Sequence, residues 1–255
     1  MMKITILGSG SAYGCPMCFN QWNLADPHNP KNERTRACVL FEFQGKNFLI
    51  DVGPDFRLQI NRNNVQNIDA VLLTHCHYDH IGGVPELPRA CKILNHVLPV
   101  FASAETMSEL QKSYAYLFSG AEPDSVRLQW NILPDFGKVN IGGVEFETFC
   151  VPHHNLHSSA FRFGDVAYVT DWESLPPKAL ERMQGLKMLL AECNNGEYEL
   201  NNGHSNIAKI KHYVNILKPE QVVLTHLSAR VDYNTLSALV PENWRLAYDG
   251  MVLLV

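Results

Sequence analysis

The chain has 255 residues, of which 46% are hydrophobic, and its 21 basic and 26 acidic residues give a formal net charge of −5. This length is enough for one large domain or two small ones with a sizeable buried core. The acidic balance disfavours a general nucleic-acid binder, which usually presents a positive field, and the lack of charge runs or low-complexity tracts disfavours disorder.

Short runs rich in β-branched and aromatic residues predict strands. In chain order, the predicted strands cover residues 3–7, 38–43, 46–52, 70–74, 144–149, 166–170, 221–225 and 245–255. Helices are predicted over residues 104–118, 178–183 and 205–217. Strands and helices are thus interleaved, which indicates an α/β fold. No linker divides the sequence, so we expect a single domain over residues 1–255.

No apolar run approaches the ~20 residues that a membrane span needs, and the amino-terminal run is too short for a signal peptide. We therefore expect no membrane association. The seven cysteines form an odd, scattered set. This pattern predicts free thiols in a reducing cytoplasm rather than a disulfide framework.

Several predicted strands stop at a residue that can bind a metal. These residues are Asp51, His75, Asp171 and His226. The sequence VLLTH at 71–75 returns as VLTH at 223–226, which hints at two similar halves that face one site. Strand ends that carry such side chains are natural places for a metal centre.

The clearest motif is HCHYDH at residues 75–80. His75 and His77, two apart on an extended turn, can share one ion, and the adjacent Asp79 and His80 point towards a second ion as the chain turns into a helix. Imidazole nitrogens and carboxylate oxygens both bind transition metals at ~2.0–2.2 Å. A polar turn is the simpler alternative, but three histidines and an aspartate within six residues favour a metal site.

One loop seldom completes a two-metal site, so further ligands are expected at other strand ends. His153 or His154 follows FCVP, and His226 follows VVLT. The carboxylate of Asp171 could bridge both ions. His204, in NNGHS at the predicted start of a helix, could contact substrate or transfer protons.

The motif HCHYDH resembles the HxHxDH signature of the metallo-β-lactamase superfamily. The resemblance is closest to the phosphoribosyl 1,2-cyclic phosphate phosphodiesterases, a family accessory to the carbon–phosphorus lyase. It implies a four-layer αββα sandwich, in which two mixed sheets pack face to face with helices outside. The supporting stretches are ILGSGSAYG, DPHNPKNERTR, LIDVGPDFR, YVTD, LTHLS and YDGM.

The resemblance implies a role for each matching residue. One metal would be held by His75, His77 and His154, and the other by Asp79, His80 and His226, with Asp171 as the bridge. His154 is preferred to His153 because it keeps the family's spacing to the next strand, SAFRF. His204 would lie beside the scissile phosphate and act in catalysis together with Asp79, while Asp51 would orient a ligand histidine.

These expectations define a dinuclear metal-dependent phosphodiesterase. Its substrate would be a small cyclic or nucleotide-like diester, similar to phosphoribosyl 1,2-cyclic phosphate, attacked by a hydroxide that bridges the two ions. The donor set suits two divalent ions, Zn or Mn, with Ni or Fe also compatible. A small-molecule partner is expected rather than nucleic acid or membrane, and the sequence leaves a homodimer open.

Two other interpretations remain open. The first is another hydrolase on the same scaffold: a tRNA 3′-processing nuclease, a lactonase or a thioesterase. The nuclease usually carries a long protruding arm, for which the stretch before His154 is too short and too acidic. The second is a non-catalytic metal-binding accessory protein. Because every expected ligand position is filled, catalysis is favoured.

Weaker features have simpler explanations. Cys15 and Cys18 form a CxxC pair, but some relatives complete a structural zinc site with a histidine where this chain has Ala229, and Cys38 would be needed as a third ligand. Residues 8–11 could cradle phosphate or simply form a tight turn. Lys31, Arg34 and Arg36 could meet a substrate phosphate or be solvated. The remaining histidines are expected to have no role at the site: His28, His96, His157 and His212.

Overall fold

The computed structural model describes residues 1–120, 124, 127–200 and 202–255, and it contains two seven-stranded sheets. The first sheet has the strand order β14-β1-β2-β3-β4-β5-β6 and the second β13-β12-β11-β10-β9-β8-β7. The first consists of β1 (Lys3–Gly8), β2 (Cys38–Phe43), β3 (Lys46–Ile50), β4 (Ala70–Leu72), β5 (Leu98–Ala102), β6 (Leu128–Ile132) and β14 (Val252–Leu254). The second consists of β7 (Phe136–Ile141), β8 (Val144–His153), β9 (Leu156–Phe163), β10 (Val166–Val169), β11 (Met188–Glu192), β12 (Gln221–Thr225) and β13 (Trp244–Leu246).

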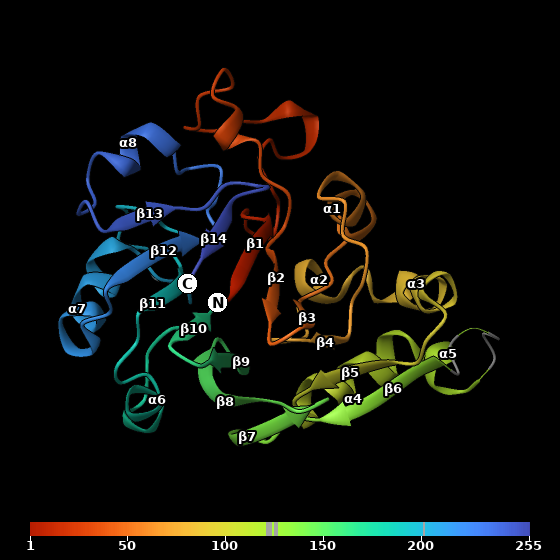
Figure 1. Cartoon of the computed structure of the whole chain (residues 1–255). Helices are drawn as coiled ribbons and strands as arrows, with labels where there is room; N and C mark the ends of the chain where they lie inside the picture. The colour runs from red at the N-terminus through yellow and green to blue at the C-terminus, as the bar shows by residue number, and fades with distance from the viewer. Residues whose placement is uncertain (121–123, 125–126, 201) are drawn as a thin grey trace.

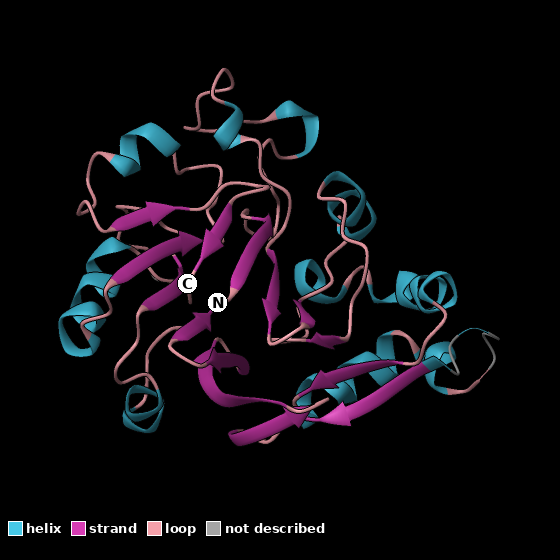
Figure 2. Cartoon of the chain, in the orientation of Figure 1, coloured by secondary structure: helices cyan, strands magenta, loops and turns pink. Residues whose placement is uncertain are grey.

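Helices flank the two sheets on the outside of the molecule (Figures 1 and 2). Those beside the first sheet are α1 (Phe56–Arg62), α2 (Tyr78–Ile81), α3 (Leu87–Leu94), α4 (Ala104–Ser113) and α5 (Ala115–Phe118). Those beside the second are α6 (Pro177–Arg182), α7 (Ile207–Leu217) and α8 (Tyr233–Ser237). The predicted four-layer αββα sandwich is confirmed.

The hydrophobic core follows these layers. One cluster joins the facing surfaces of the two sheets, and the other two lie between each sheet and its helices. At the centre, the Phe163 ring lies 4.9–5.1 Å from the rings of Phe41, Phe48 and Phe146. Each such aromatic pair adds about 0.5–1.5 kcal/mol beyond area burial. Because this cluster joins strands of both sheets, it fixes how the sheets sit on each other.

Strand direction determines where the site forms. β3 and β4 are parallel in the first sheet, and β10, β11 and β12 are parallel in the second. β8 and β10 also run the same way, since each pairs antiparallel with β9. The inner strands are buried on both faces and are therefore continuously apolar, as in VAYV of β10. Their carboxyl ends meet at one edge of the sandwich, which gathers the polar residues that follow them.

The carboxyl-terminal segment differs from its prediction as one strand over 245–255. It forms β13 in the second sheet and β14 in the first, so the chain crosses between sheets. The crossing depends on a turn in which Gly250 has φ +86° and the Asp249 carboxylate accepts hydrogen bonds from the backbone N–H groups of Ser9 and Thr35, both 2.8 Å long. Side-chain hydrogen bonds and a glycine conformation thus interrupt an apolar run that looked continuous.

Asp232 anchors the start of α8 and supports a stability prediction. Its carboxylate accepts hydrogen bonds from the N–H of Thr235, 2.9 Å away, and from the amide of Asn32, 2.7 Å away. Burial raises the pKa of Asp232, but these hydrogen bonds outweigh it and bring the pKa to about 2. Asp232→Ala is expected to lower the free energy of unfolding by about 1–2 kcal/mol, measured by urea denaturation at pH 7.

The Asp232 carboxylate also makes the free energy of unfolding depend on pH. Its folded-state pKa lies below the unfolded value of about 3.9, so its stabilisation is complete above that pH and is lost as pH falls through about 2. The difference between wild type and Asp232→Asn should therefore shrink on acidification. Asp135→Ala, at an exposed position, is the control and should change stability by less than about 0.5 kcal/mol. An Asp232→Ala protein as stable as this control would contradict the capping role.

No helix within the described part of the chain is long and apolar enough to cross a membrane.

Candidate metal centre

The candidate site lies where the carboxyl ends of the inner strands converge. Asp51 follows β3, Asp171 follows β10 and His226 follows β12, and each has a left-handed backbone with φ between 52° and 65°. Few non-glycine residues adopt this conformation, although Asp and His do so more readily than most. It turns each side chain sharply out of its strand and into the site. Such backbone geometry is concentrated at functional sites.

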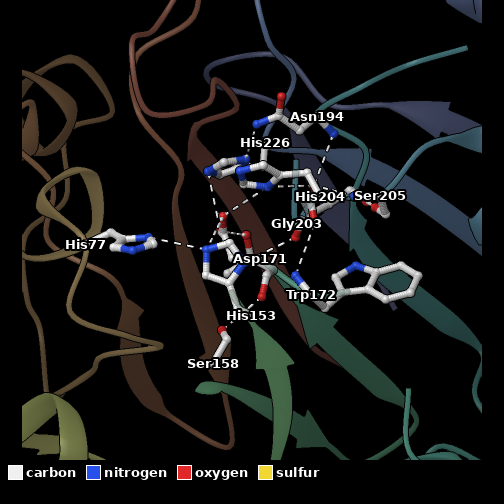
Figure 3. Close-up of polar contacts among 12 residues, drawn as sticks. His77, His153, Ser158, Asp171, Trp172, Asn194, Gly203, His204, Ser205 and His226 are labelled. Carbon is white, nitrogen blue, oxygen red and sulfur yellow. Dashed lines mark hydrogen bonds and ion pairs between the residues drawn. The ribbon is translucent and has the colours of Figure 1, made fainter. Parts of the chain in front are cut away.

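Three histidines form a first group. The side-chain nitrogens of His75 and His77 lie 2.9 Å apart, and Nε2 of His153 lies 3.3 Å from Nδ1 of His77. Tetrahedral ligands at ~2.0–2.1 Å from a metal are themselves separated by about 3.3 Å. The three nitrogens therefore have the spacing of metal ligands. Figure 3 shows His77 approaching His153 from the amino-terminal half of the chain.

A second group combines Asp79, His80 and His226. Oδ2 of Asp79 lies 3.1 Å from Nε2 of His80 and 3.4 Å from Nε2 of His226. All three side chains are buried. α2 is only one turn long and begins at Tyr78. It places Asp79 and His80 beside His226, while the His80 ring also stays close to the first group, with 4.2 Å between its centroid and that of His75.

Asp171 lies between the two groups. Its Oδ1 is 3.7 Å from Nε2 of His153, while its Oδ2 is 3.2 Å from Nε2 of His80 and 3.4 Å from Nε2 of His226. One carboxylate oxygen thus faces each group, which is the arrangement predicted for a bridging ligand. Burial alone would raise the pKa of Asp171, but the nearby His226 and His80 outweigh it and hold the pKa well below its usual range.

The donor atoms present fit divalent metal ions. Nε2 of His80 is fully buried and has no hydrogen-bond partner within the described chain, although it faces the oxygens of Asp79 and Asp171 at 3.1 and 3.2 Å. A buried nitrogen aimed at two carboxylates without a hydrogen bond is costly unless something binds it. Burial also lowers the pKa of His75 and His77, and that of His153 to about 4, so these rings are neutral and free to bind metal at pH 7.

Asp51 orients the His80 ring by contacting Nδ1, the ring nitrogen that faces away from the other donor atoms. Its Oδ2 lies 2.7 Å from Nδ1 of His80, and its Oδ1 accepts a 2.8 Å hydrogen bond from the backbone N–H of Thr74. The Thr74 hydroxyl also lies 3.0 Å from Nδ1 of His75. A carboxylate behind an imidazole fixes the tautomer and leaves Nε2 for the metal. This geometry agrees with the role that the sequence suggested for Asp51.

The preference for His154 over His153 is not supported by the structure and is corrected. β8 continues as far as His153, and strand alternation places His153 on the same buried face as Phe149 and Val151. His154 follows with φ +51°, leaves its side chain 44% exposed and lies near Glu173, with 4.0 Å between Nδ1 and Oε1. Its ring nitrogens form a possible ligand group with those of His153 and His204 but not with those of His75 and His77, although its ring centroid lies 6.2 Å from that of His77.

Glu192 is a site residue that the sequence reasoning missed. It ends the buried strand MLLAE, and its Oε1 lies 3.1 Å from Nδ1 of His204 and accepts a 3.0 Å hydrogen bond from the N–H of Ser205. Burial lowers the pKa of His204, but the hydrogen bond and charge of Glu192 outweigh this and raise it. An apolar run ending in an acidic residue, the pattern that revealed Asp171, was the available signal.

A cleft of about 880 Å³ opens beside the metal groups. His77, Asp79 and His204 lie in its wall, together with mostly neutral residues. The neutral and polar wall residues include Ser11, Tyr13, Asn23, Tyr78, Asn194, Asn195, Asn202 and Ser228. This volume exceeds the needs of a few-atom substrate and falls in the range of ligand pockets of nucleotide or drug size.

The amino-terminal cysteines have different surroundings. Cys15 packs in a small apolar cluster with Ala25 and Ala229, Cys18 is exposed, and the Cys38 thiol contacts the backbone oxygen of Asp51. Among the described residues, no group of three potential ligands includes a cysteine. Ala229 offers no ligand atom and only adds to this apolar packing.

Comparison with known proteins agrees with this architecture. A model described as a beta-lactamase superfamily domain matches residues 46–227, and the chain belongs to this superfamily, in which the fold and the His–Asp cluster imply divalent metal ions. Its fold is close to that of a solved diphosphatase from the PhnP family, with a TM-score of 0.90 and 26% identity over 100% of this chain and 98% of that chain.

Two curated relatives carry different names. An octanoyltransferase of Porphyromonas gingivalis is 26% identical over 98% of this chain, and a ribonuclease Z of Bradyrhizobium diazoefficiens is 28% identical over 52% of it. The matches cover 51% and 46% of those proteins, so the chain spans about half the length of these relatives. The shared family therefore defines the scaffold and the metal chemistry rather than the substrate.

Proposed function

We propose that this protein is a metal-dependent phosphoric diester hydrolase that acts on a small substrate. The observation that carries the proposal is the pair of donor groups joined by Asp171, at the edge of a cleft large enough for a nucleotide-sized molecule. The likeness to a diphosphatase over nearly the whole of both chains supports phosphorus chemistry over ester or thioester hydrolysis.

In this proposal, His75, His77 and His153 hold one ion, Asp79, His80 and His226 hold the other, and Asp171 joins the two groups. When bound, two divalent ions lower the pKa of water and neutralise charge on the phosphoryl oxygens. Zn and Mn both suit nitrogen and carboxylate donors. Asp51 keeps His80 in the tautomer that presents Nε2.

His204 is proposed to donate a proton to the oxygen that leaves phosphorus. It lines the cleft, and its Nδ1 is held by Glu192 at 3.1 Å and lies 3.4 Å from Asp171. The Glu192 carboxylate favours the charged imidazolium, which leaves Nε2–H available as the donor. Ser205 starts the turn before α7 and ties His204 to the end of β11 through Glu192.

The proposal is tested with metal-loaded protein. Samples reconstituted with Mn²⁺ or Zn²⁺ are assayed on bis(p-nitrophenyl) phosphate and on p-nitrophenyl phosphate, with chelator-treated protein as the control. We expect metal-dependent turnover of the diester and little of the monoester. Failure of a metal-loaded sample to cleave the diester, together with turnover of a thioester or lactone, would replace the proposal with one of the other hydrolase chemistries.

A further inference from the structure

The cleft contains one basic side chain that the reaction described above does not use. Arg230 lines the cleft wall, is exposed, and is the only lysine or arginine among the lining residues. No residue in the described part of the chain forms a hydrogen bond or ion pair with its guanidinium. An unpaired arginine in an otherwise neutral wall is suited to bind an anionic group of a ligand, because its planar fork matches phosphate oxygens.

Other basic residues near the cleft are already engaged. Arg34 is buried and donates to the backbone oxygens of Ser228 and Val231 at 3.1 and 2.9 Å. Arg36 pairs with Asp55 at 3.1 Å, and the Lys31 ammonium lies 4.4 Å from the centre of the Tyr233 ring. The basic residues of the loop at 26–36 therefore stabilise the structure, and Arg230 is the one left for substrate.

The backbone that carries Arg230 is held rigidly. The carbonyl of Ala229 accepts hydrogen bonds from the N–H groups of Leu24 and Ala25 at 3.1 and 3.2 Å, and Val231 is bonded to Ser228 and to the Arg34 guanidinium. Arg230 lies four positions after His226, so their Cα atoms are at most about 14 Å apart. One fixed segment thus presents a histidine to the metal groups and an arginine to the adjoining wall of the cleft.

Arg230 also borders a second cavity. This cavity, of about 220 Å³, shares Arg230 with the main cleft and is otherwise lined by residues such as Leu24, Glu197 and Tyr198. A ligand that extends from the metal groups into it must pass the guanidinium. Its apolar and aromatic residues suit an organic group, whereas the carboxylates of Glu197 and Asp232, which also line it, disfavour another anion there. The anionic part of such a ligand is therefore expected at Arg230.

We propose that Arg230 binds a second phosphoryl group next to the scissile one, and that the substrate is an organic diphosphate with a P–O–P linkage. This rests on the proposed metal-dependent hydrolysis at phosphorus and extends it from a phosphate ester bond to the phosphoanhydride bond of a diphosphate. A cyclic monophosphate carries one negative charge, which the metal groups already neutralise, and would leave Arg230 unpaired. A diphosphate diester carries two negative charges, of which one can face the metal groups and the other can pair with Arg230.

The hydrolysis balances with water as the only co-reactant. The oxygen of one water molecule bonds to the phosphorus at the metal groups, and the bond from that phosphorus to the bridging oxygen breaks. The bridging oxygen leaves with the electron pair on the second phosphorus. Two phosphate monoesters result, and the two protons of the water pass to solvent as these products ionise at neutral pH.

A pair of matched substrates tests the role of Arg230. Bis(p-nitrophenyl) phosphate and P1,P2-bis(p-nitrophenyl) diphosphate differ only by one inserted phosphoryl group, and their products are resolved by phosphorus NMR. In the metal-loaded enzyme, Arg230→Ala is expected to lower the ratio of kcat/KM for the diphosphate over the monophosphate diester by about 10- to 100-fold. Arg230→Lys keeps the positive charge but loses the two-pronged guanidinium. Its ratio of kcat/KM values should therefore lie between those of wild type and Arg230→Ala.

Arg89→Ala is the matched control, because Arg89 is exposed and lies in α3 at a different cavity. Its ratio should equal that of wild type. An unchanged ratio in Arg230→Ala, with both substrates cleaved, would overturn the proposal.

A binding measurement separates this proposal from the proposed activity. The diphenyl ester of methylenediphosphonate, in which CH2 replaces the bridging oxygen, is titrated into metal-loaded protein alongside diphenyl phosphate. Tighter binding of the diphosphonate that is lost in Arg230→Ala would support the site even if wild type cleaved neither substrate, an outcome that would refute only the hydrolase proposal. Equal affinities of both ligands for wild type and Arg230→Ala would refute the Arg230 site.

Discussion

Replacing His153 with alanine is expected to reduce diester turnover by at least about 100-fold and to lower the bound metal from two ions towards one per chain. His153 is fully buried, and its Nε2 lies 3.3 Å from Nδ1 of His77 and 3.7 Å from Oδ1 of Asp171. Loss of one of three protein ligands removes both affinity and the geometry that activates water. Metal content is measured by plasma mass spectrometry on the same samples as activity.

The neighbouring histidine provides the control. His154→Ala is expected to keep its full metal content and to retain activity within about threefold of wild type, because its side chain is half-exposed and its nitrogens form no ligand group with those of His75 and His77. The two substitutions remove the same side chain at adjacent positions that differ in burial, so metal content and activity are compared on samples of both variants that are shown to be folded. If His154→Ala lost metal while His153→Ala kept it, the ligand preference drawn from the family resemblance would be right and the geometric assignment wrong.

Replacing His204 with alanine is expected to lower kcat by about 100- to 10,000-fold while both metals stay bound, since general acid catalysis contributes about that much. The loss should depend on the leaving group. 2′,3′-cyclic AMP expels an alkoxide that needs a proton, whereas bis(p-nitrophenyl) phosphate expels a phenolate that leaves without one. The decrease in kcat should therefore be much larger for the cyclic nucleotide.

Glu192 is proposed to act by positioning His204, and substitution of Glu192 tests this role. Glu192→Gln keeps the size of the side chain and removes the charge that stabilises the imidazolium. We expect a decrease of about tenfold in kcat with the same leaving-group dependence as His204→Ala, little change in KM and unchanged metal content. An equal decrease for both substrates would mean that His204 holds the phosphoryl group rather than protonating the leaving oxygen.

Much of the site could be predicted because its residues follow strands. Apolar runs that end in Asp or His revealed Asp51, His75, Asp171 and His226, and parallel strands place such residues at one edge. The same rule applied to MLLAE would have revealed Glu192. The four layers were implied by the family resemblance, whereas the strands themselves were only partly recognised: β5, β6, β7 and β11 were not among the predicted elements, and β9 was named only as SAFRF, through the family's spacing.

Other features depended on contacts that no local pattern contains. The choice between His153 and His154 is set by how far β8 continues, which the pairing of His153 with Leu156 across the β8–β9 hairpin decides. The division of residues 245–255 between two sheets depends on Asp249, whose hydrogen-bond partners lie more than 200 positions away in the sequence. The sequence alone could not single out Arg230 as a ligand-binding residue, because this depends on the contacts that the other basic residues make in the folded protein.

The left-handed conformations of Asp51, Asp171 and His226 have a consequence for protein engineering. Each costs of order 1 kcal/mol relative to glycine, which adopts such angles freely. Glycine at these positions would relieve the backbone strain, but it would also remove a proposed metal ligand at Asp171 or His226, or the hydrogen bonds by which Asp51 holds Thr74 and His80. This protein thus faces a trade-off between stability and activity at the ends of its inner strands, so consensus or directed-evolution libraries should leave these three positions unchanged.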